Sequence, residues 1–184
     1  MPLAAERNPH AAFGHSDGGW MDSMERAKRS KEGAALNRSV QERLVRGLNL
    51  NLANMTSLAT AYKQAHWNLQ GPGFAQLHEL FDRFADQTRE YADLVAERAV
   101  QLHGTSHGTI EGAVKETTLP PFPLDEHRED LLVAALVERA NAAIFEVRHG
   151  IDGSEDDLPT QDVYIEIARG LEKQEWMLRS HLTG

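Results

Sequence analysis

Apolar residues recur at three- and four-residue steps along most of the chain, which is the spacing of one face of an α-helix. The clearest stripes predict long helices over about residues 39–68, 73–102, 125–151 and 160–182. A short helix is predicted near 110–116, between the second and third of these. No useful length alternates with period two, so no strand is predicted. The pattern predicts an all-α bundle of four helices with a long crossover between the second and third.

One apolar stripe from each long helix forms the predicted core. The stripe positions are Leu44, Leu48, Leu52, Met55, Ala59, Tyr62, Phe74, Leu77, Phe81, Phe84, Thr88, Tyr91, Val95, Leu132, Leu136, Ala140, Ala143, Val147, Ile151, Tyr164, Ile167, Leu171, Leu178 and Leu182. The first stripe ends on His66, just before the helix-breaking Gly71-Pro72-Gly73. Long helices joined in this way are typical of ferritin-like folds.

Residues 1–37 differ from the rest of the chain in composition. They are poor in large aliphatic residues and contain several Gly and Pro, so we interpret them as a flexible tail preceding a bundle over 38–184. Within the tail, residues 20–30 have the pattern of a short helix anchored by Trp20.

Composition excludes several classes of protein. The 184 residues contain no Cys, so neither a disulfide nor a thiolate metal site is available. No apolar run approaches the ~20 residues of a membrane helix, and the N-terminus lacks the pattern of a secretory signal. We therefore expect a cytoplasmic protein with no membrane partner. The net charge of −9 argues against nucleic-acid binding over the whole surface, which leaves only a local basic segment.

The segment 65–98 has the strongest chemical signal. It holds two histidines and three carboxylates, the residue types that bind iron and similar metals: His66, His78, Asp82, Asp93 and Glu97. Two of its pairs are four residues apart and so share a helix face, His78 with Asp82 and Asp93 with Glu97. We predict that all four point away from the core stripe.

The distance between these two pairs predicts a site shared by two subunits. Asp82 and Asp93 are eleven residues apart, or about 16 Å along a helix. The metals of a two-metal centre lie only ~3.5–4 Å apart, so one helix cannot bring both pairs to one centre. An antiparallel second copy, related by a two-fold axis, brings His78 and Asp82 against Asp93 and Glu97. The alternative is a solvated acidic face with no metal role.

A metal centre inside one bundle is a competing hypothesis. Such ferritin-type centres use Glu-x-x-His motifs on two helices. Only Glu146 and His149 have this spacing, and we interpret them as surface residues.

Several motifs in this stretch resemble those of the Dps family, the mini-ferritins named as DNA-binding proteins from starved cells. The matching residues are Lys63, His66, Trp67, Asn68, Gly71, Pro72, Phe74, Leu77, His78, Leu80, Phe81, Asp82, Asp93, Ala96, Glu97 and Arg98. The segment 169–178 is also similar to the last helix of the family, and the resemblance covers about residues 37–182.

The resemblance implies a four-helix bundle, a hollow shell of twelve subunits and ferroxidase centres at two-fold interfaces. It implies that His66, His78 and Asp82 come from one chain and Asp93 and Glu97 from its mate. The expected substrates are Fe²⁺ and an oxidant, preferably hydrogen peroxide and otherwise dioxygen. The expected product is Fe³⁺ in a stored ferric mineral, which protects DNA from oxidative damage. Trp67 would lie near the centre, either as a radical trap or as a packed aromatic residue.

Three further clusters are weaker candidates. Asp152, Glu155, Asp156 and Asp157 form an acidic turn that either lines a pore for ferrous ions or is simply solvated. His10 and His15 are candidate metal ligands in the tail. The candidate DNA contacts are Arg26, Lys28, Arg29 and Lys31. They support an alternative function, a nucleoid-associated shell that binds and compacts DNA and in which metal oxidation is secondary.

Overall fold

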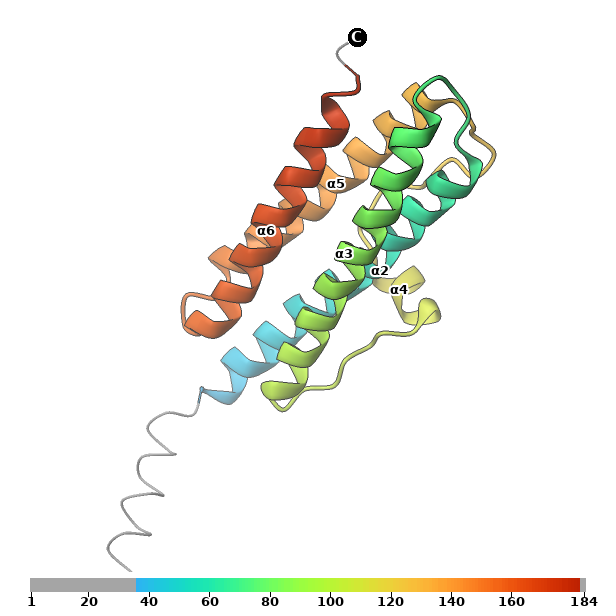
Figure 1. Cartoon of the computed structure of the whole chain (residues 1–184). Helices are drawn as coiled ribbons and strands as arrows, with labels where there is room; N and C mark the ends of the chain where they lie inside the picture. Colours follow the sequence, from blue (N-terminus) through green and yellow to red (C-terminus); the bar gives the residue numbers. More distant parts are fainter. Residues whose placement is uncertain (1–35, 183–184) are drawn as a thin grey trace, which may run out of the picture. The chain divides into compact units, whose positions relative to one another are not determined.

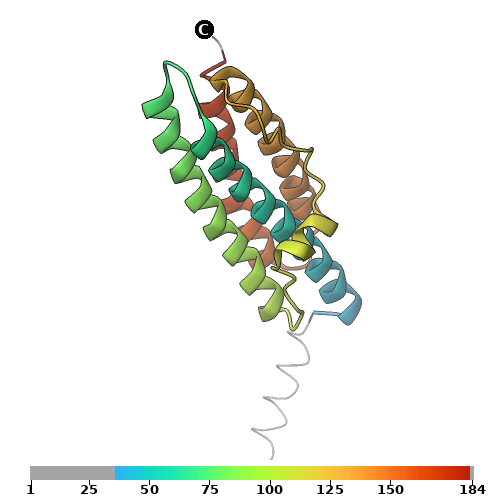
Figure 2. The same ribbon diagram turned by 90° about the vertical axis from the view of Figure 1, so that its right-hand side faces the viewer.

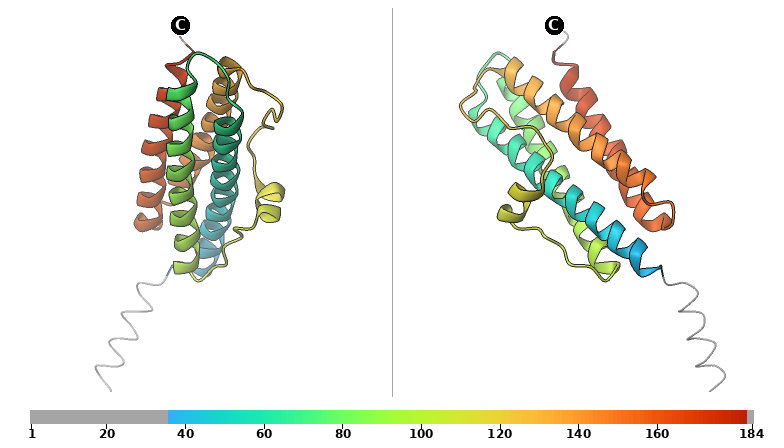
Figure 3. Two further views of the ribbon diagram at one scale, coloured as in Figure 1. Left: turned by 45° about the vertical axis from the view of Figure 1, so that its right-hand side comes forward. Right: turned by 180° about the vertical axis from the view of Figure 1, so that it is seen from behind.

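The computed structural model describes residues 36–182, which contain five α-helices. These are α2 (Arg38–Asn68), α3 (Phe74–Gln101), α4 (Ile110–Glu116), α5 (Glu129–Asp152) and α6 (Leu158–Arg179). The long helices lie side by side, with α2 next to α3 and α5 next to α6 (Figure 1). The crossover after α3 carries α4 past α2 and returns along the bundle to the start of α5 (Figures 2 and 3). Within 36–182, isolated bridge pairing links only Gln70 and Arg128, so the predicted all-α fold is confirmed.

Helix boundaries agree with the sequence pattern except at α5 and α6. The α5 helix begins at Glu129 and not near residue 125, because the preceding backbone is extended. There the amide of Gln70 donates a hydrogen bond to the carbonyl of His127 at 2.7 Å. The α6 helix begins two residues earlier than predicted and ends three residues earlier, at Arg179. No helix within residues 36–182 is long and apolar enough to span a membrane.

The bundle core follows the predicted stripes closely. Side chains from all four long helices are fully buried, including Leu48, Met55, Tyr62, Phe81, Leu132, Leu136, Ile167, Leu171 and Leu178. Two predicted core positions are wrong: Phe74 is 45% exposed and Leu182 is 38% exposed. Phe74 opens its helix and packs beside the ring of His78, whereas Leu182 lies beyond the end of α6.

The centre of the bundle contains a chain of neutral hydrogen bonds. The Tyr62 hydroxyl donates to Gln174 at 3.1 Å, the Gln174 amide donates to Gln87 at 2.9 Å, and the Gln87 amide donates to Tyr91 at 2.6 Å. Burial raises the pKa of Tyr62 well above its usual range, so its phenol stays protonated. The buried polar residues of the described bundle include no Asp, Glu or His. Its interior therefore lacks the ligands of a ferritin-type centre.

The turn between α2 and α3 is fixed by the first residue of α5. Gly71 has a φ of +152°, and a Cβ there would lie 2.4 Å from an oxygen of Glu129. The same Glu129 carboxylate accepts a hydrogen bond from the amide of Gly73 at 2.8 Å. Because this turn joins the helix ends that carry His66 and His78, Glu129 fixes the relative position of the two histidines.

Candidate metal centre

The two predicted histidine ligands are in direct contact. His66 lies in the last turn of α2 and His78 in the second turn of α3, and their rings stack with centroids 3.6 Å apart. The Nδ1 of His66 donates to the carbonyl of His78 at 2.8 Å, and the Nδ1 of His78 donates to the carbonyl of His66 at 2.9 Å. A carbonyl can only accept, so each ring carries its proton on Nδ1. In the neutral form of each ring this leaves the lone pair on Nε2 for a metal.

Asp82 follows His78 by one helical turn and forms an ion pair with Lys63 of α2. The hydrogen bond from Lys63 is the main reason that the pKa of Asp82 lies below its usual range, and the charge of Lys63 adds to it. Asp82 is therefore ionised at neutral pH. The Lys63 ammonium also lies 5.6 Å from the centroid of Trp67, whose side chain is 67% exposed.

Asp93 and Glu97 lie further along the same side of α3 and are exposed. Neither takes part in an ion pair or side-chain hydrogen bond within residues 36–182. Nor does the described chain bring three or more His, Asp or Glu side chains together in a group that could hold a metal. A single subunit thus presents a histidine-containing half at one end of this face and a carboxylate half at the other.

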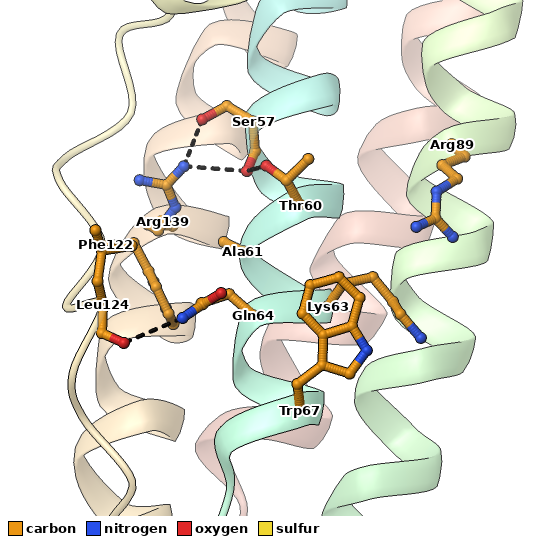
Figure 4. A pocket seen from close by; sticks show the side chains of 10 residues that line it. All are labelled: Ser57, Thr60, Ala61, Lys63, Gln64, Trp67, Arg89, Phe122, Leu124 and Arg139. Atoms are coloured by element: carbon orange, nitrogen blue, oxygen red, sulfur yellow. Dashed lines mark hydrogen bonds between the residues drawn. The ribbon is translucent and has the colours of Figure 1, made fainter. Parts of the chain in front are cut away.

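A groove borders the histidine-containing half (Figure 4). Its volume is about 460 Å³, and its lining includes Lys63 and Trp67 of α2, Arg89 of α3 and Arg139 of α5. The buried Arg139 donates hydrogen bonds to Ser57 Oγ at 2.6 Å and to the carbonyl of Pro120. These bonds join the crossover to α2 beside the candidate site.

Comparison with known proteins identifies the family. The model of the ferritin-like domain matches residues 45–184. The DNA protection during starvation protein of Agrobacterium fabrum is 39% identical over 73% of this chain and 85% of the relative. The chain belongs to the Dps family of ferritin-like proteins.

Solved Dps structures agree with this membership. Dps from Microbacterium arborescens, in its high iron form, is 32% identical over 82% of this chain and 99% of its own, with a TM-score of 0.76. Dps from Mycobacterium smegmatis is 33% identical over 81% of this chain and 86% of its own, with a TM-score of 0.78. The resemblance of the sequence to Dps proteins is therefore confirmed.

The residues that the Dps motif did not single out as ligands nevertheless shape the candidate site. Lys63 compensates the negative charge of Asp82. Its position three residues before His66 is a sequence signal that could have identified Lys63 as part of the site. Arg139 is 5% exposed and follows Leu132 and Leu136 on the core side of α5. A charged residue in an apolar stripe indicates a buried role, but the sequence does not say that its partners are Ser57 and Pro120.

The candidate pore residues have different surroundings. Asp157 caps α6 and forms an ion pair with Arg98 at 2.6 Å, and its side chain is only 11% exposed. Asp156 forms an ion pair with Arg43 at 2.7 Å. Asp152 and Glu155 are exposed and have no ion-pair partner within residues 36–182. Within residues 36–182, Asp156 and Asp157 therefore have cationic partners, whereas Asp152 and Glu155 do not, and the pore assignment stays a prediction.

The candidate residues of the tail lie outside the described residues. These are the metal candidates His10 and His15, the DNA candidates Arg26, Lys28, Arg29 and Lys31, and the helix predicted over 20–30. Among the basic residues that follow, Arg38 forms an ion pair with Glu42, and Arg43 forms one with Asp156.

Proposed function

We propose that this protein oxidises ferrous iron at centres shared between two subunits and stores the ferric product inside a shell. Iron storage and DNA protection are the general functions associated with the Dps family. The observation that carries the proposal for this chain is the division of one helix face into two half-sites. One half has two histidines whose Nδ1 atoms are hydrogen-bonded to carbonyls, and the other has two carboxylates without ion-pair or hydrogen-bond partners among residues 36–182.

The positions of the half-sites on α3 support a two-fold relationship. His78 and Glu97 lie equally far on either side of the midpoint between Gln87 and Thr88. Asp82 and Asp93 lie equally far from the same midpoint. A two-fold axis perpendicular to α3 at that level therefore brings each histidine half against the carboxylate half of a second copy. Two equivalent centres result for each pair of subunits.

Each ligand has a chemical role in this proposal. Glu97 and Asp93 supply hard anionic oxygens, which favour iron increasingly as its charge rises on oxidation. His66 supplies a neutral nitrogen to the same ion. His78 and Asp82 hold the second ion or its water, and Trp67 lies beside them. Each ring binds a metal only through a ring nitrogen that carries no proton, because a protonated nitrogen has no lone pair to donate.

The proposed reaction balances with hydrogen peroxide as oxidant. Two ferrous ions each give one electron, the peroxide O–O bond breaks, and two protons complete two molecules of water. Because both electrons leave together from adjacent ions, no hydroxyl radical is released. The ferric ions then hydrolyse and add to a mineral in a shell that we propose to contain twelve subunits. Dioxygen is the alternative oxidant, and removal of iron and peroxide protects DNA.

Exchange of subunits between two inactive variants tests the sharing directly. We expect His66→Ala and Glu97→Ala proteins each to lose rapid oxidation when tested alone. In shells refolded from an equal mixture, about a quarter of the centres combine an intact histidine half with an intact carboxylate half. About a quarter of the wild-type rate should therefore return, as followed by ferric absorbance after anaerobic ferrous loading. A mixture that stays inactive would contradict a shared centre.

We expect Lys63 to weaken binding of the second iron. A metal entering at Asp82 must displace the ammonium of Lys63. The ion pair between Lys63 and Asp82 is partly exposed, so its strength is modest. Lys63→Met should therefore tighten binding of Co²⁺ at this position by about fivefold. Calorimetric titration of the assembled protein measures this change. Lys63→Arg, which keeps the positive charge, is the matched control and should leave the affinity close to that of the wild type.

Direct DNA binding is the second hypothesis, and relatives bear the name DNA protection during starvation protein. We place it on the basic residues 26–31; of the basic residues that follow, Arg38 and Arg43 have carboxylate partners on the bundle. It requires that deletion of residues 1–37 abolish a salt-sensitive mobility shift. Such a shift with full-length protein at low salt would favour it.

A further inference from the structure

Asp86 and Arg89 lie on α3 between the two half-sites. The residues Asp82, Asp86, Arg89 and Asp93 follow one another at steps of four, three and four, so they form one stripe along the helix. Asp86 and Arg89 form an ion pair at 2.6 Å, and their side chains are 69% and 52% exposed. Both ends of this stripe belong to the proposed ferroxidase centre, and its middle has no assigned role.

These two residues are also symmetric about the midpoint of the proposed site. Asp86 and Arg89 lie equally far on either side of the midpoint between Gln87 and Thr88, each about 2 Å from that midpoint along the helix axis. The two-fold axis that completes the metal centres therefore brings Arg89 level with the partner subunit's Asp86. By the same symmetry, Asp86 comes level with the partner subunit's Arg89.

We propose that Asp86 and Arg89 form a reciprocal charge clamp with the same residues of a second copy, and that this clamp sets the register of the shared metal centres. The inference rests on the two-fold arrangement of the proposed function. Within one subunit each carboxylate faces one guanidinium, and across the axis each faces two. The clamp is neutral as a whole, so it separates the acidic ligands at either end without adding to their repulsion.

The order of the charges disfavours the neighbouring registers. If the antiparallel helices slide by three residues in one direction, about 4.5 Å, Arg89 comes level with the partner subunit's Arg89. If they slide equally far in the other direction, Asp86 comes level with the partner subunit's Asp86. Both slipped registers oppose like charges, whereas the register that aligns the metal ligands opposes unlike charges. The charges of Asp86 and Arg89 thus attract those of the second copy in one register and repel them in the two neighbouring registers.

The surface beside the clamp has room for a second copy. Arg89 and Thr60 line both the groove of about 460 Å³ near Trp67 and a second one of about 310 Å³ that reaches Asp93. The second groove is walled largely by small side chains, among them Ala92 and Ala96. Hollows on both sides of an exposed arginine, on the face that carries both half-sites, fit an opposing helix whose charges complement the stripe.

Charge reversal separates this clamp from a solvated ion pair. Asp86→Arg alone brings four positive charges to the axis, and Arg89→Asp alone brings four negative charges. Each single variant should weaken the pairing of subunits by about 100-fold and shift sedimentation profiles toward smaller species. The double variant Asp86→Arg/Arg89→Asp restores opposite charges across the axis and should recover assembly to within about threefold of the wild type.

The control reverses another exposed ion pair, Arg38 with Glu42 at the start of α2. Neither Arg38→Glu nor Glu42→Arg should alter the sedimentation profile. Single variants at Asp86 or Arg89 that assemble as the wild type does would overturn the clamp. So would a double variant that fails to recover although circular dichroism shows folded helices. Co²⁺ binding by wild-type protein and its loss in Glu97→Ala report on the shared centre separately, so failure of the clamp and failure of the proposed function are distinguishable.

Discussion

Replacing Glu97 by Ala is expected to slow rapid oxidation of ferrous iron by about 100-fold or more. Glu97 is exposed on the last two turns of α3 and has no partner within residues 36–182, so its carboxylate is free to bind a metal. In the proposed centre it supplies a negative oxygen to the ion that gains charge on oxidation. Its loss removes both an anchor for ferrous iron and stabilisation of the ferric product.

The measurement is anaerobic loading with ferrous ions followed by rapid mixing with hydrogen peroxide. Wild-type protein should bind about two ions per subunit, since each pair of subunits forms two equivalent centres and each centre holds two ions. Glu138→Ala on α5 is the control, because Glu138 is also an exposed helical glutamate and lies on another helix. Equal rates for wild type and Glu97→Ala would exclude Glu97 as a ligand and favour the interpretation of this helix face as solvated surface.

Local pattern was sufficient to predict most of the fold. Apolar spacing predicted the four long helices, because each of them buries one stripe and the spacing of that stripe is a property of the sequence. At the start of α5 the error arises because a distant partner changes the local preference. The α5 helix starts late because the segment before it pairs with Gln70, far away in the chain. Phe74 has the spacing of a core residue but packs on His78 at the surface.

The candidate site was predictable to the extent that it depends on helix geometry. Spacing on α3 predicted two half-sites too far apart for one chain, and no group of three or more potential ligands comes together in the described subunit. Spacing could not predict the contacts that position the ligands. Three such contacts depend on how α2, α3 and α5 pack. His66 stacks on His78, each ring donates a hydrogen bond to the carbonyl of the other residue, and Glu129 accepts a hydrogen bond from the turn between α2 and α3.

Asp157→Ala is expected to lower the stability of the subunit by about 3 kcal/mol. Asp157 accepts hydrogen bonds from the backbone and hydroxyl of Thr160 and forms an ion pair with Arg98. The two charged side chains are only 11% and 15% exposed, so removing the carboxylate leaves a poorly solvated guanidinium. The thermal midpoint should fall by roughly 6–12 °C. Because Arg98 follows Glu97, the loss should also loosen the end of α3 that carries the carboxylate half-site.

The pH dependence of this effect separates the ion pair from the helix cap. Burial alone would raise the pKa of Asp157, but hydrogen bonds from Thr160 and Arg98 and the charge of Arg98 outweigh it, so the pKa lies below its usual range. As the pH falls, the carboxyl group of residue 157 therefore takes up a proton in the unfolded chain before it does so in the folded protein. The stabilisation is complete above the unfolded pKa of about 4 and is lost as the pH falls through the lower folded value.

Asp157→Asn keeps a capping oxygen but not the charge, so it should destabilise the subunit less than Asp157→Ala does. The difference in thermal midpoint between wild type and Asp157→Asn should be constant near neutral pH and shrink below about pH 4. A difference that grows on acidification would show that the ion pair does not stabilise the fold.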